Sequence, residues 1–328
     1  AVNRFYYDKE HERSKTLNFI AGNVKAGVNY NIDRHNNVFV NGGYISRAPF
    51  FSGGAFLKPE VTTAANPNAV NEKCVSAEVG YEFHSPKFTA QINGYWTRWY
   101  DQTMVKTNSM QDGTYYNMNM SGVASRHAGV EAAATYKPFN WLEITGMFSY
   151  GDWIRDSNTI GYFYDSQSQP LANLSTGAIA SGIMAEDHLW AKLNTKGRKI
   201  GGSAQTTGAL GITVKPLKGW RIGVDWTAAA RNYSDYSITG NTLNTGQTIE
   251  LGEPWRIPWG NQLDLNASYT FNIAGMKATI FGNVNNLCNY NYIMDAYTPA
   301  TADGTWQNAY RIFYSFGRTF SLRLKLTF

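Results

Sequence analysis

Charge and cysteine are both scarce in this sequence. Asp, Glu, Lys and Arg together make up 16% of the 328 residues, whereas ordinary soluble domains contain about 25%. The mean hydropathy is nevertheless −0.38, so the polar character comes from Asn, Thr, Ser, Gly and Gln. The two cysteines, Cys74 and Cys288, lie far apart and have no CxxC or histidine companion at metal-ligand spacing. We therefore expect two unpaired thiols that pack rather than bind metal.

Long apolar runs and basic blocks are also missing. No stretch of about 18 consecutive apolar residues is present, which argues against a transmembrane helix. The first residues, AVNRFYYDKE, lack the basic start and apolar run of a signal peptide. The net charge is +5, but the lysines and arginines are scattered along the chain. This pattern does not indicate a nucleic-acid partner.

Aromatic residues and a strict alternation of apolar with polar residues are abundant. Tyr, Phe and Trp make up 15% of the chain. In the last segment, SLRLKLTF, Leu322, Leu324 and Leu326 alternate with Arg323 and Lys325. The same period of two recurs in CVSAEVGYEF (74–83), GVEAAATYK (129–137), WLEITGMFSY (141–150), WRIGVDWTA (220–228), QLDLNASYTF (262–271) and KATIFGNVN (277–285). A period of two places alternate side chains on opposite faces of a β-strand.

The connections between these segments alternate between short and long. The short ones fall at 33–37, 85–87, 139–140, 217–219 and 274–275. The long ones fall at 47–71, 108–113, 158–202, 236–259 and 293–308. Tight turns on one side and long loops on the other are typical of an outer-membrane β-barrel, whereas a soluble sandwich has no reason to sort its loops in this way. The pattern predicts an all-β, antiparallel, up-and-down transmembrane barrel.

About twelve strands are expected in this chain. They are 2–7 (in part), 22–32, 38–46, 72–84, 88–105, 114–137, 141–157, 203–215, 220–235, 260–273, 277–292 and 308–328. Aromatic residues flank the short turns on the apolar face, which predicts a girdle at one membrane interface. These residues are Phe83, Tyr136, Trp220, Phe271 and Phe328.

The alternation also assigns the two faces of the barrel. Leu265, Ile280, Leu324 and Leu326 are expected to contact lipid, and Arg318 is expected on the same side at the outer rim, within reach of lipid phosphates. Charged and amide side chains of the other face are expected to line the lumen. They are Glu78, Glu82, Glu131, Glu143, Arg221, Asp225, Asp264, Asn283, Asn285, Arg323 and Lys325. The carboxylates at 143, 225 and 264 are expected near the short turns, paired with nearby Lys and Arg side chains rather than used in catalysis.

Many aromatic residues fall in or beside the long loops. Rigid aromatic side chains offer large contact area at low entropic cost, so we expect a ligand-binding surface at the mouth of the barrel. For any single residue, packing of the loops on one another is the alternative. The candidates are Phe50, Phe51, Trp99, Tyr100, Tyr115, Tyr162, Phe163, Tyr164, Tyr233, Tyr236, Tyr290, Tyr292 and Trp306.

The motifs of the common enzyme classes are absent. The sequence has no GxSxG elbow, no phosphate-binding loop and no dinucleotide fingerprint. The stretch HERSK (11–15) begins like a zinc-binding HExxH motif but has Lys15 where the second histidine belongs. We therefore expect no catalysis, no bound metal and no cofactor.

Several pieces of the sequence, taken in order, resemble TonB-dependent outer-membrane receptors. They are GVNYNI (27–32), NNVFVNGGYISRAPFF (36–51), NPNAVNEKCVSAEVGYEF (66–83), SRHAGVEAAATYKP (125–138), FGNVNNLCNYNYI (281–293) and RIFYSFGRTFSLRLKLTF (311–328). The resemblance covers essentially the whole chain. It implies a barrel of roughly 22 strands around a plug, and import of a siderophore, haem, cobalamin or glycan with energy supplied by TonB.

The chain departs from this pattern because it contains neither a plug, nor a TonB-binding segment, nor all the strands. We expect residues 1–328 to be the C-terminal part of such a receptor. The implied partners are outer-membrane lipid, the receptor's own plug and remaining strands, the TonB complex, the small-molecule or glycan ligand and a surface lipoprotein. Two alternatives stay open: a complete twelve-stranded passive diffusion channel, and an outer-membrane hydrolase, for which no nucleophile–base pair is found.

Overall fold

The computed structural model describes residues 2–3, 6–7, 12–109, 113–237, 244–299 and 311–328. All regular secondary structure in these residues is β-strand. No helix in these residues is long and apolar enough to cross a membrane. The main body is one 14-stranded sheet, which agrees with the all-β class predicted from the alternation.

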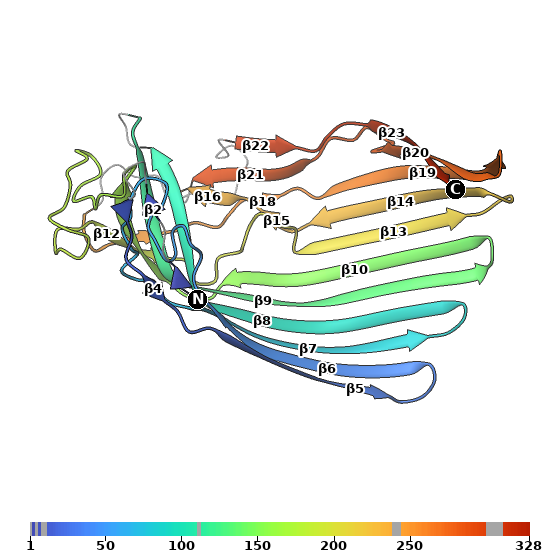
Figure 1. Ribbon diagram of the computed structural model, residues 1–328, viewed down its shortest axis with the longest axis horizontal. Helices are drawn as coiled ribbons and strands as arrows, with labels where there is room; N and C mark the ends of the chain where they lie inside the picture. Colours follow the sequence, from blue (N-terminus) through green and yellow to red (C-terminus); the bar gives the residue numbers. More distant parts are fainter. Residues whose placement is uncertain (1, 4–5, 8–11, 110–112, 238–243, 300–310) are drawn as a thin grey trace.

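The long strands pair in sequence order, each antiparallel to its neighbour. The order across the sheet is β23-β20-β19-β14-β13-β10-β9-β8-β7-β6-β5. The bounds are β5 Gly22–Asn31, β6 Asn36–Arg47, β7 Glu72–His84, β8 Phe88–Ser109, β9 Tyr115–Phe139, β10 Leu142–Arg155, β13 Thr206–Val214, β14 Trp220–Ala230, β19 Gly260–Ile273, β20 Met276–Asn285 and β23 Thr319–Thr327. Figure 1 shows short turns at one end of these strands and long loops at the other. The predicted sorting of the connections is therefore confirmed.

The short turns are built from residues suited to reversing the chain. In the first, the Asp33 carboxylate accepts hydrogen bonds from the backbone N–H of His35 at 2.7 Å and of Asn36 at 2.9 Å. The His35 N–H is the main reason that the pKa of Asp33 lies below its ordinary value. Gly219 and Gly275 take φ values of 85° and 79° in two other short turns, a conformation that a Cβ atom disfavours.

Several expected strand ends were wrong. The strand expected to reach 235 ends at Ala230, because Arg231 has a φ of 54°. The strand expected to reach 292 ends at Asn285, because Asn286 takes the same left-handed conformation. Asparagine tolerates this conformation better than most residues.

The first and last expected strands are each divided. Segment 308–328 forms β22 (Arg311–Tyr314), which pairs with β21 (Ile293–Pro299), and β23, which pairs with β20. Segment 2–7 contains β1 (Val2–Asn3) and β2 (Tyr6–Tyr7), which pair with β4 (Leu17–Asn18) and β3 (Glu12–Arg13) rather than with the main sheet.

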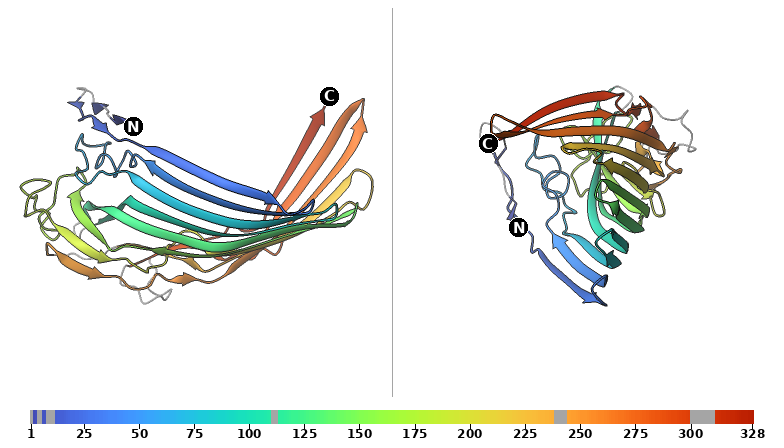
Figure 2. Two further views of the ribbon diagram at one scale, coloured as in Figure 1. Left: turned by 90° about the horizontal axis from the view of Figure 1, so that it is seen from below. Right: turned by 90° about the vertical axis from the view of Figure 1, so that its right-hand side faces the viewer.

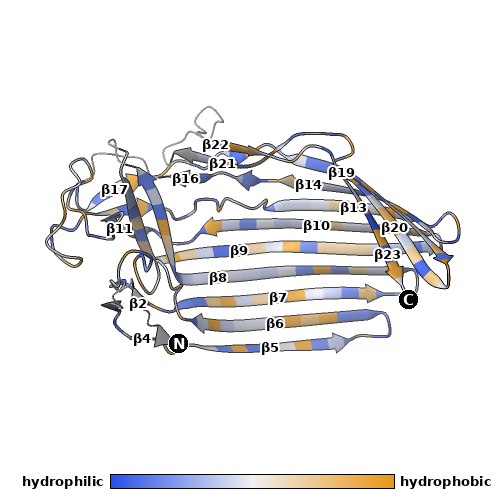
Figure 3. Ribbon diagram, turned by 45° about the horizontal axis from the view of Figure 1, so that its top comes forward, coloured by the Kyte–Doolittle hydropathy of each residue, from blue (hydrophilic) through white to orange (hydrophobic). Residues whose placement is uncertain are grey.

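The sheet has one polar and one apolar face, as the period of two predicts. On the polar face, cross-strand register aligns Asn41 with Glu78, and Asn93 with Glu131. On the other face, Ile280 lies opposite Leu324, and both are exposed. Figure 3 shows the resulting alternation of hydrophilic and hydrophobic residues along the strands. The two-faced pattern of the strands therefore agrees with the alternation, and which face meets lipid stays a prediction.

Aromatic rings gather beside the short turns. Trp220 lies 4.8 Å from Tyr269, which lies 5.5 Å from Phe271, and Phe88 lies 6.3 Å from Tyr136, measured between ring centroids. These neighbours include three residues of the predicted girdle. A girdle of aromatic side chains is typical of the polar–apolar boundary of a membrane barrel.

The sheet is strongly curved and open. Figure 2 shows it curling so that its first and last strands face each other across a gap. Within the described residues, β5 pairs only with β6, and β23 pairs only with β20.

The long loops fold into two packed layers beyond the sheet. The larger layer includes β11 (Thr159–Asp165), β12 (Trp190–Asn194) and β17 (Gln247–Glu250), which join the sheet through β9. The smaller layer includes β15 (Asn232–Tyr233), β16 (Asp235–Ser237), β18 (Arg256–Ile257), β21 and β22. Lys106 of β8 connects the second layer to the sheet by donating to Asp235 at 2.7 and 2.5 Å.

Candidate functional site

A groove of about 700 Å³ crosses the polar face of β5 to β10. Three glycines, at 27, 42 and 43, are among the residues that line it. The side chains that line it are mostly neutral and polar. They are Lys25, Asn41, Ser76, Glu78, Asn93, Tyr95, Thr97, His127, Glu131 and Trp153.

Two carboxylates form the floor of this groove. The Asn93 side-chain amide donates to Glu78 at 3.0 Å and to Glu131 at 3.5 Å, and Asn41 donates to Glu78 at 3.5 Å. Within the described part of the chain, neither carboxylate forms an ion pair with Lys or Arg. The floor therefore keeps negative charge and acceptor oxygens available to a partner.

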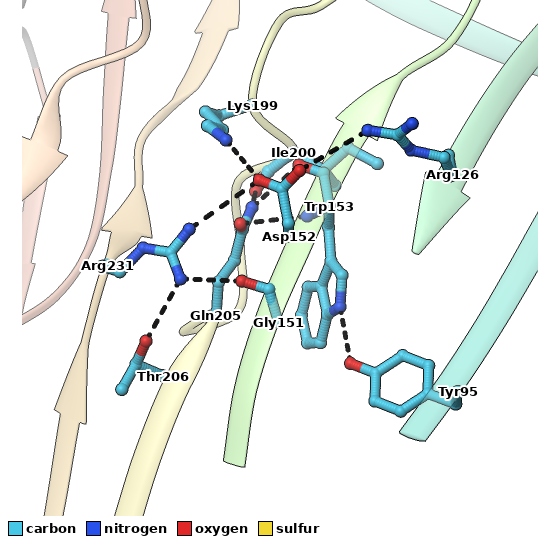
Figure 4. Close-up of polar contacts among 10 residues, drawn as sticks. All are labelled: Tyr95, Arg126, Gly151, Asp152, Trp153, Lys199, Ile200, Gln205, Thr206 and Arg231. Carbon is cyan, nitrogen blue, oxygen red and sulfur yellow. Dashed lines mark hydrogen bonds and ion pairs between the residues drawn. The ribbon is translucent and has the colours of Figure 1, made fainter. Parts of the chain in front are cut away.

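Aromatic side chains form the wall nearest the long loops. The Trp153 indole donates to the Tyr95 hydroxyl at 2.9 Å, as Figure 4 shows. The His127 ring lies 5.6 Å from the Trp153 ring. These three side chains come from β8, β9 and β10, so the sheet holds the aromatic surface in place.

Sequence reasoning missed this aromatic wall. Candidate ligand residues were sought among loop aromatics, and Tyr95, His127 and Trp153 lie within strands. A signal was present, because Tyr95 alternates with Asn93 and Thr97 and so shares their polar face.

The loop aromatics expected to bind ligand divide into exposed and packed groups. Phe50, Phe51, Tyr115 and Tyr290 expose 60%, 42%, 62% and 47% of their surface. Tyr290 stacks on the half-buried Tyr292 at 6.4 Å. Among the described loop candidates, these four rings are exposed enough to meet a ligand from solvent.

The packed group belongs to the cores of the loop layers. Phe163 is buried in a core with residues of β9, β11 and β12. Tyr164 is buried and lies 4.9 Å from the ring of the buried His188, against which Tyr162 also lies. Tyr233 is buried in the smaller layer. Burial raises the pKa of Tyr164, which keeps its phenol neutral. Trp306 and the side chain of Tyr236 lie outside the described residues.

Trp99 and Tyr100, near the middle of β8, each pack against an arginine. The Arg47 guanidinium lies 5.0 Å from the Trp99 ring and 4.7 Å from the Phe50 ring. It also forms an ion pair at 2.6 Å with Glu72, whose side chain is buried. Tyr100 lies 4.6 Å from the guanidinium of Arg98. The Arg47 cluster holds Phe50 and Trp99 beside one another.

The eleven residues expected to line the lumen share the polar face in the cross-strand register. One expected ion pair forms, between Lys137 and Glu143 at 3.2 Å. Asp225 instead accepts from Asn266 at 2.8 Å, and Arg323 stacks 4.3 Å over Phe281.

Asp264 corrects another expectation. It accepts the backbone N–H of Asn286 at 2.7 Å, at the point where β20 runs into a long loop. It therefore lies toward the loops and not near the short turns. The placement was wrong because β19 begins only four residues before Asp264.

In the described part of the chain, the cysteines and the metal-binding residue types form no cluster. Both thiols are free, with Cys74 buried and Cys288 exposed. Within the residues that the structure describes, no three His, Cys, Asp or Glu side chains are close enough together to hold a metal ion.

Comparison with known proteins gives a family match and several similar folds. The sequence matches the family described as "TonB dependent receptor-like, beta-barrel" over residues 6–287. No curated protein sequence matches it.

Several solved structures with similar folds are transporters or import receptors by name. The ferric citrate transporter FecA has a TM-score of 0.59 and 14% identity, over 97% of this chain and 40% of that one. The copper transporter OprC has a TM-score of 0.55 and 14% identity, over 94% of this chain and 40% of that one. The ferric-catecholate import receptor Fiu from E. coli K12 has a TM-score of 0.54 and 12% identity, over 98% of this chain and 39% of that one. This chain spans about two fifths of their length.

Proposed function

Because this chain belongs to the TonB-dependent receptor β-barrel family, we propose that it serves as the C-terminal part of an outer-membrane receptor that imports a scarce nutrient or metal chelate. The family consists of receptors and transporters and not of enzymes. The observation that carries the proposal is the polar groove with its aromatic wall, on the face that the barrel would enclose.

The proposed ligand first meets the exposed loop aromatics. Phe50, Tyr115 and Tyr290 present broad apolar surfaces to solvent, and such rings bind planar or hydrophobic parts of a ligand at low entropic cost. Ferric chelates, haem, cobalamin and glycans all offer such surfaces beside polar groups.

The proposed path then follows the groove. Tyr95 and Trp153 offer ring faces at its upper wall, and the amides and hydroxyls below them offer hydrogen bonds. Neutral polar groups hold a ligand weakly at many points, so a ligand can move along such a wall.

A folded plug inside the barrel forms the second part of the proposal. The carboxylates of Glu78 and Glu131 have no ion-pair partner among the described residues, so a basic segment within the lumen fits them by charge. Among the described residues, β5 and β23 each pair with one neighbour only. An unpaired strand edge in lipid costs several kcal/mol per unsatisfied backbone group, which supports the presence of additional strands in the whole barrel. Energy for import would reach the plug through TonB.

Fluorescence quenching tests the binding step. The purified full chain, in detergent, is titrated with ferric citrate, a ferric catecholate, haem, cobalamin and an oligosaccharide. We expect saturable quenching of tryptophan fluorescence by one of these classes. Replacing Phe50 and Phe51 with Ser should weaken that binding about tenfold, since each lost aromatic contact contributes about 0.5–1.5 kcal/mol. Trp141→Phe, at a short turn, serves as the control and should leave the affinity unchanged.

Two results would count against this function. If no chelate, tetrapyrrole or glycan class quenches saturably, the receptor assignment loses its binding step. If the chain alone gives steady ion conductance in a planar bilayer, the passive channel is the better description.

A further inference from the structure

A row of basic side chains crosses the apolar face of the sheet at its loop end. Arg98 of β8 lies directly opposite Arg126 of β9, and Arg126 lies opposite Ile154 of β10. Ile154 in turn forms a bridge with Lys199. These residues occupy one line across four adjacent segments, on the side opposite the groove.

Two carboxylates, Asp152 and Asp156, form ion pairs with these basic side chains. Asp152 lies 2.5 Å from the Lys199 ammonium, 3.5 Å from the Arg126 guanidinium and 3.8 Å from that of Arg231. Figure 4 shows the three cations converging on Asp152 from different segments. Asp156 pairs with Arg98 at 2.6 Å. We call this set the rim cluster: Arg98, Arg126, Asp152, Asp156, Lys199 and Arg231.

The rim cluster is short of negative charge. It contains four cations and two carboxylates, which leaves an excess of two positive charges. Like charges directly opposite on neighbouring strands destabilise a sheet, and Arg98 and Arg126 occupy such positions. The Arg126 Nε atom is also buried and has no hydrogen-bond partner among the residues that the structure describes.

An exposed apolar surface begins immediately below the rim cluster. Trp96 lies two residues before Arg98 on the same face and exposes 37% of its surface. Val130 and Tyr150, which face each other on β9 and β10, each expose 48%. A molecule that fits both the rim cluster and this apolar surface has a compact, negatively charged group attached to an apolar part.

We propose that the rim cluster binds the phosphate of a phosphorylated lipid in the outer leaflet, with the acyl chains lying on Trp96, Val130 and Tyr150. The proposal rests on the outer-membrane location proposed above. A phosphate monoester carries about −1.5 to −2 charges near neutral pH, which matches the excess. Arg126 and Arg98 provide planar donors that hold phosphate oxygens in pairs. Inorganic phosphate alone would leave the apolar surface uncovered.

Lipid binding by the purified full chain tests this site. Native mass spectrometry in detergent measures the affinity for lipid A bearing both phosphates, for the same lipid with its phosphates removed, and for inorganic phosphate. We expect the phosphorylated lipid to bind at least tenfold more tightly than the dephosphorylated lipid, since charge-assisted hydrogen bonds are about twice as strong as neutral ones. Inorganic phosphate should bind more weakly than the phosphorylated lipid.

Variants with opposite expected effects separate binding from folding. Combined Arg126→Gln and Lys199→Gln should weaken phosphorylated-lipid binding about tenfold or more. Asp152→Asn should strengthen it severalfold, because it removes a competing carboxylate and keeps every cation. The control is the combined Lys215→Gln and Lys218→Gln, which removes two charges at a short turn.

Three outcomes would overturn the site. They are equal binding of the two lipids, weaker lipid binding by the Asp152 variant, and inorganic phosphate bound as tightly as the phosphorylated lipid. None of them affects the quenching assay with chelates, so failure here is distinguishable from failure of the receptor function.

Discussion

Leu324 allows a direct measurement of which face of the sheet meets lipid. It lies near the middle of β23, exposes 60% of its surface and faces Ile280 on β20. Leu324→Arg would place a charge within the apolar band. In a membrane barrel this change costs about 2–4 kcal/mol at the midplane.

Its neighbour Arg323 provides the opposite test. The guanidinium lies 4.3 Å over the Phe281 ring on the polar face, and an exposed contact of this kind contributes about 0.5–1 kcal/mol. Arg323→Leu should therefore cost less than half as much as Leu324→Arg. Ser321→Arg is a matched control, since it adds the same side chain to the same strand on the polar face. It should cost about 1 kcal/mol for the lost hydrogen bond from Asn283.

Equilibrium unfolding in denaturant, with the chain inserted in lipid vesicles, measures these differences. The free energy of unfolding follows from the midpoint and slope of the transition. Equal losses for Leu324→Arg and Ser321→Arg would refute the assignment of faces.

Three further changes test the turns, the loop core and the pH response. Gly219→Ala should destabilise the chain by about 1–3 kcal/mol, because it combines strain at a φ of 85° with a backbone oxygen 2.3 Å from the new Cβ; Gly275→Ala, with open space, should cost less in the same unfolding assay. Leu193→Ala should cost about 2–5 kcal/mol in the larger loop layer, where the side chain is fully buried, and faster hydrogen exchange confined to that layer would report it. The backbone N–H of Ser181, the main contributor, and its hydroxyl lower the pKa of Asp187 from its ordinary value of 3.8. The turn that Asp187 closes by accepting from Ser181 should therefore be fully stabilised above about pH 4. Its amides should lose protection from hydrogen exchange as the pH falls further, and Asp187→Asn should abolish this pH dependence.

The strands and their facing were predictable from sequence because both depend on local alternation. A residue such as Leu324 needs only its neighbours at 323 and 325 to be assigned a face. Cross-strand register then follows from matching those faces and from the length of each short turn. The strand ends at Ala230 and Asn285 were harder, because each depends on one backbone torsion.

The loop aromatics were not predictable individually because their burial depends on distant contacts. Phe163 and Phe50 occur in similar loop sequence, yet Phe163 is fully buried and Phe50 exposes 60% of its surface. Contacts between distant segments position these loops: Asn119 of β9 donates to the Gly53 carbonyl at 2.7 Å, and Lys58 of loop 47–71 donates to the Ser166 carbonyl of loop 158–202 at 3.0 Å. No local pattern encodes these pairings.

The end of β10 connects the groove with the rim cluster, because successive residues of a strand point to opposite faces. Trp153 faces the groove and Asp152 faces the rim cluster. Both need a fixed backbone, yet β13 stops pairing with β10 at Tyr150. The buried side chain of Gln205 takes over: its amide accepts the Trp153 N–H at 3.1 Å and donates to the Trp153 carbonyl at 2.9 Å. The Trp153 carbonyl also accepts the Ile200 backbone N–H at 3.1 Å. Gln205 and this neighbouring segment together hold the end of β10, so the two proposed sites on opposite faces share the same support.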